Sequence, residues 1–199
     1  MNCDELQKGK KHMDPRRQLV DFLGVVEKLK CNTRHSWMSS GRQESVAEHS
    51  WRLALMAMLC ADEYPHINVS KLIKMCLIHD LGEAVTGDVP SFYKTDANER
   101  AEDAAIDSLL AMLPQNYASE LGELFREMEE MQTDEARLWK ALDNMEAVIS
   151  HNEAPLSTWI PLERELNLTY GEDKAAFSPW TKHLRDLLRA DSIRKLETE

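Results

Sequence analysis

Residues that break regular backbone structure are scarce in this chain of 199 residues, which holds only seven glycines and seven prolines. Together with 43% hydrophobic residues, this composition excludes a collagen-like protein and argues against a disordered one. Long apolar runs are also missing, since the longest, residues 53–61, is too short to cross a bilayer. The first fifteen residues are polar and charged, unlike a signal peptide. We therefore expect a globular protein with no membrane partner.

Cysteines are few and unclustered. The four cysteines, Cys3, Cys31, Cys60 and Cys76, form no CxxC pair, and the last two fall within apolar helical patterns. A chain of this length buries roughly 70% of its extended surface on folding, so it needs no disulfide or metal to hold its fold. We therefore predict reduced cysteines in a cytoplasmic protein.

Basic residues are in deficit. The chain has 24 Lys+Arg against 35 Asp+Glu, a formal net charge of −11. Wrapping a nucleic-acid backbone or binding an anionic membrane needs clustered Lys and Arg, so polymeric nucleic acid is not an expected partner. A small phosphorylated ligand is not excluded, because one or two local cations or a metal can hold it.

The hydrophobic pattern predicts an all-α fold, a single helical bundle with two buried central helices. Residues 1–14 are interpreted as a flexible, basic N-terminal extension, and residues 15–199 as the domain. No segment has the alternation and turn residues of a β-hairpin, and residues 31–44 are expected to form a polar loop. Breakers divide 152–179 into short pieces. Helices are expected from Pro15 onward and over 46–63, 69–83, 97–113, 117–131, 134–151 and 180–197.

Polar side chains interrupt the stripes that should be buried. In the second central helix, His79, Asp80 and Glu83 continue apolar stripes, and a buried carboxylate needs a partner. His49 lies in the first turn of the other central helix, just after a capping box. Asp143 lies beside the apolar stripe of a third helix. Two imidazoles and two carboxylates predict a site for one divalent ion such as Mn, Co, Fe, Ni, Zn or Mg.

Each of these residues also has an ordinary interpretation. A histidine in a helical core is more often a hydrogen-bonded core residue than a ligand, and His49 alone is a weak candidate because it lies so near a helix start. Asp143 could be a solvated residue on a helix flank, and a His-Asp dipeptide arises by chance in many proteins. The metal hypothesis rests on their conjunction on three helices. Because no thiolate joins the set, a closed structural zinc site is disfavoured.

Two strings carry a family resemblance: ESVAEHSWR (44–52) and HDLGEAVTGDVP (79–90). The pattern H…HD…D, matched by His49, His79-Asp80 and Asp143, resembles the HD-domain superfamily of metal-dependent phosphohydrolases. The strings are similar to the branch that contains bacterial 5′-deoxynucleotidases and related eukaryotic HD-domain proteins. The resemblance covers roughly residues 18–150.

The resemblance implies a 5′-nucleotidase in which a metal-bound water attacks the phosphate of a (deoxy)nucleoside monophosphate. It makes Glu83 and Asp88 the catalytic acids, which orient or deprotonate the water or protonate the leaving sugar oxygen. Arg34 matches a loop arginine that approaches the phosphate, for which a guanidinium supplies paired donors. His35 stands where well-studied deoxynucleotidases have a tryptophan thought to exclude the ribose 2′-hydroxyl, so a strict preference for deoxyribose does not carry over.

The resemblance also implies a homodimer. Glu129 lies in an acidic stretch that is similar to a segment reaching a neighbouring subunit's site, although a solvated face is the plainer interpretation. Two alternatives stay open: hydrolysis of another nucleotide, such as a cyclic dinucleotide or guanosine tetraphosphate, or a non-catalytic interaction module with a vestigial metal site. No other histidine extends the motif at a clear spacing, which favours a single metal and a nucleoside monophosphate.

Overall fold

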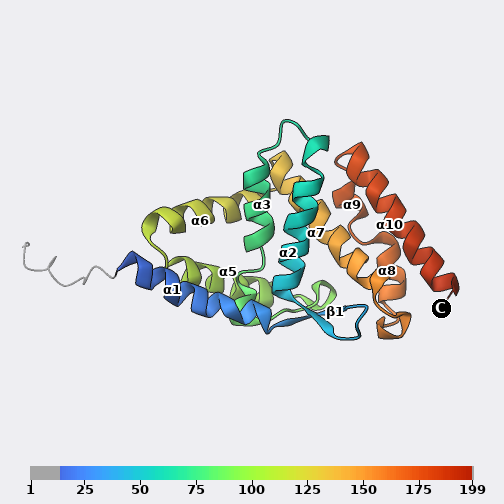
Figure 1. Cartoon of the computed structure of the whole chain (residues 1–199), viewed down its shortest axis with the longest axis horizontal. Helices are drawn as coiled ribbons and strands as arrows, with labels where there is room; N and C mark the ends of the chain where they lie inside the picture. Colours follow the sequence, from blue (N-terminus) through green and yellow to red (C-terminus); the bar gives the residue numbers. More distant parts are fainter. Residues whose placement is uncertain (1–13, 199) are drawn as a thin grey trace, which may run out of the picture.

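The computed structural model describes residues 14–198 and confirms the all-α prediction (Figure 1). The predicted flexible extension over 1–14 lies almost entirely outside the described residues. No helix among the described residues is long and apolar enough to cross a membrane. The helices are α1 (Pro15–Val26), α2 (Val46–Leu59), α3 (Val69–Ile78), α4 (Glu83–Thr86), α5 (Asp96–Leu110), α6 (Gln115–Glu130), α7 (Asp134–Glu153), α8 (Glu163–Thr169), α9 (Glu172–Ala175) and α10 (Pro179–Thr198). Short 3₁₀ turns are η2 (Glu27–Lys30), η3 (Ala61–Glu63), η4 (Ser91–Tyr93) and η5 (Leu156–Thr158).

The core lies where α2, α3 and α7 pack together. α2 begins with the expected capping box: the Ser45 hydroxyl accepts from the backbone N–H of Glu48, and the Glu48 carboxylate accepts from that of Ser45. Leu53, Leu72 and Leu142, one from each helix, are fully or almost fully buried. Burying each such side chain contributes about 2 kcal/mol, so this interface fixes the elements that carry the site.

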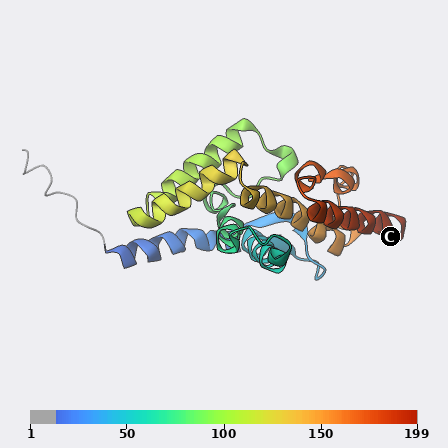
Figure 2. The same cartoon turned by 90° about the horizontal axis from the view of Figure 1, so that it is seen from above.

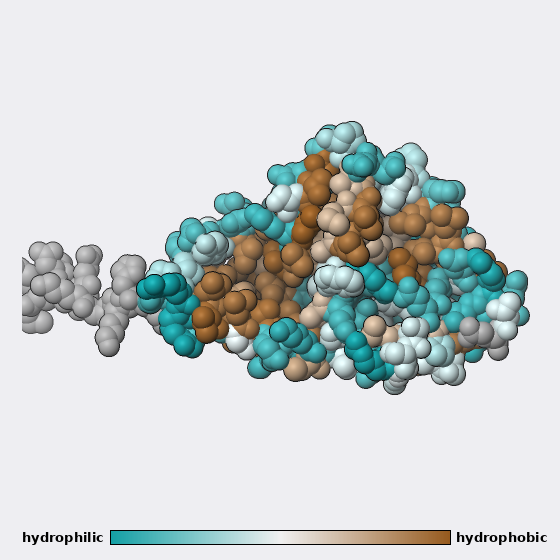
Figure 3. Space-filling view, viewed as in Figure 1, coloured by the Kyte–Doolittle hydropathy of each residue, from teal (hydrophilic) through white to brown (hydrophobic). Residues whose placement is uncertain are grey.

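The sequence had suggested that the two central helices are buried all round. In the structure each of them has an exposed face. Trp51, Met58 and Leu59 of α2 are more than half exposed, and Leu77 of α3 is nearly so. One apolar face of these helices packs in the core, and another lies at the surface over α1, α2 and α3 (Figure 3). An apolar residue pattern alone does not tell a buried face from an exposed one.

The prediction of a loop over 31–44 was wrong, because part of this segment forms an antiparallel hairpin. Strands β1 (Thr33–Trp37) and β2 (Gln43–Ser45) pair in it, and Gly41 provides the positive φ in the turn. The polar residues of β1 lack the alternation that marks a strand, so backbone pairing rather than an apolar face defines it. The hairpin carries Arg34 to the site.

The helix predicted over 69–83 ends at Ile78, where His79 is the C-cap. A tight turn follows, and α4 then begins at Glu83. This turn lies close to α5, and glycine permits the approach, because a Cβ at Gly82 would lie 3.1 Å from the backbone oxygen of Glu102. His79 and Asp80 therefore lie in an irregular segment between two helices, not on one continuous face.

α9 and α10 pack against α7, and α8 packs against α10 (Figure 2). Gly171 has φ +75°, and a Cβ there would lie 2.6 Å from the Cβ of Asn144, so only glycine fits between α8 and α9. The buried Arg185 of α10 donates from Nε to the backbone oxygen of Tyr170 and from Nη2 to that of Asn167. These contacts fix α8 beside the site.

Candidate metal centre

The four predicted ligand residues converge on one point. Nε2 of His49 lies 3.2 Å from Nε2 of His79 and 3.1 Å from Oδ1 of Asp143. Nε2 of His79 lies 3.0 Å from Oδ2 of Asp80 and 3.5 Å from Oδ1 of Asp143. The residues come from α2, the α3–α4 turn and α7, so the packing of these three helices assembles the cluster.

The hydrogen bonds on the far sides of both imidazoles fix how they face the cluster. Nδ1 of His49 contacts the carboxylate of Glu146, and Nδ1 of His79 lies 2.9 Å from the backbone oxygen of Cys76. Both partners only accept, so each Nδ1 carries a proton, and Nε2 of each ring faces the cluster, where it binds either a second proton or a metal ion. Two such nitrogens and two carboxylates turned toward one point favour a bound cation. The donor set therefore fits a divalent ion with nitrogen and oxygen ligands.

The charges of the cluster favour a cation in the same way. Burial opposes a charged His79, yet Asp80 and Asp143 outweigh it and raise the pKa of His79 to about 10. Burial also opposes an ionised Asp143, but Lys140, with Nζ 2.8 Å from Oδ2, and the two histidines hold the pKa of Asp143 well below its ordinary value. A proton and a metal ion compete for such a site, so metal binding there releases protons.

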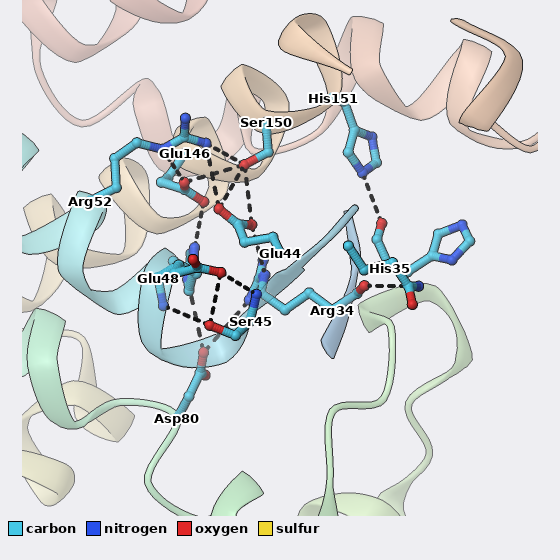
Figure 4. A network of polar contacts seen from close by, with 12 residues as sticks. Arg34, His35, Glu44, Ser45, Glu48, Arg52, Asp80, Glu146, Ser150 and His151 are labelled. Atoms are coloured by element: carbon cyan, nitrogen blue, oxygen red, sulfur yellow. Dashed lines mark hydrogen bonds and ion pairs between the residues drawn. The ribbon is translucent and has the colours of Figure 1, made fainter. Parts of the chain in front are cut away.

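A second buried network lies behind His49 (Figure 4). Glu146 of α7 is fully buried and accepts from His49 and from Nε of Arg52, at 2.6 Å. Arg52 also contacts Ser150, and the Ser150 hydroxyl lies 3.2 Å from Oε2 of Glu44 on β2. Glu44, His49 and Glu146 could in principle hold an ion themselves, but Arg52 already supplies the cation there. The network therefore supports His49.

Glu146 was not among the site residues predicted from the sequence. Its signal is a carboxylate among the apolar residues Leu142, Met145 and Val148 of α7, which resembles the signal that pointed to His79 and Asp80. Because Glu146 follows His49 by 97 residues, only the fold shows that they touch.

A cavity of about 260 Å³ opens onto the cluster, and Glu83, Asp88 and Arg34 all line it. Nη1 of Arg34 lies 3.6 Å from Oδ2 of Asp80, so its guanidinium faces the metal ligands. Burial and the charges of Asp80 and Asp88 raise the pKa of Glu83 to about 9. One end of the cavity thus combines a cation site, a buried arginine and two carboxyl groups.

The remaining predicted residues lie in different places. His35 lines the cavity, with Nε2 3.1 Å from Oε1 of the buried Glu163. Glu129 is exposed on α6 and does not line the cavity, so its predicted role stays a prediction.

Comparison with known proteins decides the family. The profile of the HD domain matches residues 26–184, most of the chain. The chain belongs to the HD-domain family. Over 141 residues, 69% of this chain and 68% of the relative, it is 34% identical to the 5′-deoxynucleotidase HDDC2 of Bos taurus. It is 31% identical to the 5′-deoxynucleotidase hdd1 of Schizosaccharomyces pombe, over 65% of this chain and 69% of that protein.

A solved structure has the same fold. The crystal structure of a "predicted metal-dependent phosphohydrolase" from Magnetospirillum magnetotacticum MS-1 superposes with a TM-score of 0.77 and 28% identity, covering 91% of this chain and 94% of that one. The family match, the curated relatives and this structure together show that the chain is a metal-dependent phosphohydrolase.

Proposed function

We propose that this HD-domain enzyme is a 5′-nucleotidase that releases phosphate from (deoxy)nucleoside monophosphates, and that residues 15–199 form its single domain. The observation that carries the proposal is the convergence of two imidazole nitrogens and two carboxylates at one end of a cavity that also holds Arg34. The names of the relatives, 5′-deoxynucleotidases, support the substrate class.

His49, His79, Asp80 and Asp143 are the proposed ligands of one divalent ion. Such an ion supplies Lewis-acid chemistry, activating water and neutralising phosphate charge. The protein's own contribution is to hold the four donors in place: Glu146 orients His49, the backbone of Cys76 orients His79, and Lys140 orients Asp143. The identity of the ion is open to Mn, Co, Fe, Ni, Zn or Mg, because the N/O donor set suits several of them.

Arg34 is the proposed phosphate-binding cation. Its guanidinium lies between Glu44, 3.6 Å from Nε, and Asp80, 3.6 Å from Nη1, and neither distance is a hydrogen bond. Its N–H donors are therefore available to an anionic ligand, and a guanidinium binds phosphate oxygens in pairs. This local cation explains how a chain of net charge −11 can bind a phosphate ester.

Glu83 and Asp88 are the proposed proton-transfer pair. With a pKa raised to about 9, Glu83 holds a proton at neutral pH and suits the role of donor to the leaving sugar oxygen. Asp88, which lines the same cavity and is less buried, takes the complementary role of orienting the attacking water and accepting its proton.

His35 is proposed to contact the sugar. Paired with Glu163 and packed edge-on against Phe92, its ring is a polar wall rather than a bulky apolar one. A polar wall can hydrogen-bond a 2′-hydroxyl, so we expect ribonucleotides to be accepted together with deoxyribonucleotides.

We also propose a homodimer formed through the apolar surface of α1, α2 and α3 (Figure 3). Leu59 is 73% exposed and Leu23 is 53% exposed, and a contiguous apolar patch of this kind marks an interface. Leu59→Glu should give a monomer in sedimentation velocity, whereas Ile193→Glu on α10 should leave a dimer. A cytoplasmic location is proposed because Cys31, Cys60 and Cys76 are free thiols.

The test of the function is a phosphate-release screen over nucleoside monophosphates, with metal-free protein reloaded with each divalent ion in turn. We expect release that depends on the added metal and is strongest for 5′-monophosphates. Release that is metal-independent, or absent with every ion, contradicts the proposal. Preferred hydrolysis of a cyclic dinucleotide or guanosine tetraphosphate favours the alternative substrate class.

A further inference from the structure

The cavity extends well beyond the proposed metal ligands, along one face of α7. Asp143, Ala147 and His151 all line it, and their spacing of four residues puts them on the same side of the helix. Eight residues of α-helix rise about 12 Å. A phosphate held near Asp143 therefore leaves room for a sugar and a base toward His151, and the small side chain of Ala147 leaves the passage open.

The far end of the cavity contains a buried polar group with an unused hydrogen-bonding atom. Asn167 of α8 lines the cavity and is only 4% exposed. Its side-chain amide lies 3.1 Å from Nδ1 of His151. Burial lowers the pKa of His151, so its neutral ring carries one N–H; because Nε2 donates to the backbone oxygen of His35, Nδ1 accepts from the amide N–H of Asn167. One polar atom of the amide has no hydrogen-bond partner among residues 14–198, and this tautomer makes it the oxygen. Leaving a buried polar atom unsatisfied costs about 1–3 kcal/mol. A donor on a bound ligand is the partner this atom lacks.

Asn167 is held rigidly. The buried Arg185 donates from Nη2 to its backbone oxygen at 3.0 Å, and His151 holds its side chain. His151 is itself fixed, because its Nε2 lies 3.2 Å from the backbone oxygen of His35 (Figure 4). A side chain whose backbone and amide are both fixed is preorganised for selective binding.

The surroundings of Asn167 suit a neutral ring and not a second phosphate. Phe92, Leu166 and Tyr170 supply flat or apolar walls to the cavity. Of the cations that line the cavity, Arg34 faces the proposed metal ligands at the other end, and Lys140 and Lys94 contact Asp143 and Glu102. The buried carboxylate behind this end, Glu163, repels an anion.

We propose that this end of the cavity binds the nucleobase, and that the amide oxygen of Asn167 accepts a hydrogen bond from a ring N–H or exocyclic amino group of the base. The proposal rests on the 5′-nucleotidase function and adds a specificity-determining residue to it. Asn167 touches the base, whereas His151 and Arg185 are positioning residues that act through it.

The test compares a substrate that has a base with one that lacks it. KM is measured for thymidine 5′-monophosphate and for 2-deoxyribose 5-phosphate with the wild-type enzyme and Asn167→Ala. Loss of one hydrogen bond should raise KM for the nucleotide about 3- to 10-fold and leave KM for the sugar phosphate unchanged. Asn167→Leu, which has a similar shape but no polar side-chain atom, should raise the same KM at least as much.

Asn152→Ala is the matched control. Asn152 also lies on α7, but its side chain bonds to Leu188 and Ser192 on α10 and does not line the cavity. The substitution therefore removes contacts of the same helix without changing the cavity. It should leave the ratio of the two KM values unchanged. A separate titration of thymidine into each protein, followed by calorimetry, reports base binding without catalysis and should show the same 3- to 10-fold loss for Asn167→Ala.

The outcomes separate the inference from the function on which it rests. Equal KM changes for both substrates, or none for either, overturn the role of Asn167. A ratio that shifts equally in Asn152→Ala overturns it as well. If no protein releases phosphate but thymidine binding still depends on Asn167, the base site stands and the proposed hydrolysis fails.

Discussion

Replacing Glu146 with glutamine tests whether the buried network positions the metal ligands. Glu146 is fully buried, and its two oxygens accept from different donors: Oε2 from Nδ1 of His49, and Oε1 from Nε of Arg52 at 2.6 Å. Glutamine has the same shape but only one acceptor oxygen, and its amide nitrogen must face a second N–H. One of the two contacts is therefore lost whichever way the amide turns.

The magnitude follows from these contacts. Removing an outer partner of a metal-binding histidine typically costs 10- to 100-fold in metal affinity, or about 1.4–2.8 kcal/mol. We expect Glu146→Gln to weaken Mn²⁺ binding by about this factor. The free energy of unfolding of the metal-free protein should fall by about 1–3 kcal/mol, the cost of a buried donor left unpaired.

The assay is calorimetric Mn²⁺ titration of metal-free protein, together with urea unfolding in the presence of a chelator. Glu153→Gln is the matched control, because Glu153 also accepts from Arg52, at 2.6 Å, but is half exposed and does not touch His49. It should leave Mn²⁺ affinity unchanged and alter stability by less than about 1 kcal/mol. Unchanged Mn²⁺ affinity in Glu146→Gln, or equal losses in both variants, would show that Glu146 does not position His49 for metal binding.

Three further predictions concern stability and reactivity. In urea titrations, Gly171→Ala should lower the free energy of unfolding by at least about 1 kcal/mol, because the residue has a positive φ and the added Cβ would clash. Gly24→Ala in α1 should raise the free energy of unfolding by up to about 1 kcal/mol, because no atom lies near the added Cβ. The raised pKa of Glu83 means that the ionised form is disfavoured in the fold, so stability falls as pH rises from the ordinary carboxyl value toward about 9. Glu83→Gln should therefore raise the unfolding free energy of metal-free protein by about 2 kcal/mol or more at pH 8 but not at pH 4. The same variant should release no phosphate. Equal stability of variant and wild type at pH 8 would contradict the raised pKa of Glu83. Burial raises the pKa of Cys60 to about 11, so its thiol should react with a disulfide reagent at pH 8 only after unfolding, whereas Cys31→Ser should remove one fast-reacting thiol; fast labelling of native Cys60 is the contrary result.

The sequence predicted the helical architecture well, because its signals are local. The capping box at Ser45 and the stripes through Leu53 and Leu72 depend only on residues a few positions apart. The helix that should have continued through Glu83 stops at Ile78, and the turn after it brings Gly82 close to α5, a contact between segments distant in the sequence. The hairpin that carries Arg34 was missed for a similar reason, since its polar strand is defined by its partner.

The candidate site divides along the same line. His49, His79, Asp80 and Asp143 could be predicted because residues of metal-ligand type interrupt apolar stripes. Arg34, His35, Glu83 and Asp88, which line the cavity, were predicted only from the family resemblance, and the residues that orient the ligands were not predicted. Glu146 and Asn167 matter through contacts with His49 and His151, and no local pattern marks those contacts.

Whether one bound ion drives phosphate release is tested by a stoichiometric titration of metal-free enzyme with Mn²⁺. Phosphate release from a deoxynucleoside monophosphate is followed at each step. We expect activity to rise linearly and to reach its plateau at about one ion per chain, because His49, His79, Asp80 and Asp143 form a single site. Asp80→Asn, shown to be folded by circular dichroism, should bind no Mn²⁺ at these concentrations and release no phosphate. A plateau at two ions per chain would contradict the single metal site, and full Mn²⁺ occupancy in Asp80→Asn would contradict the role of Asp80 as a ligand.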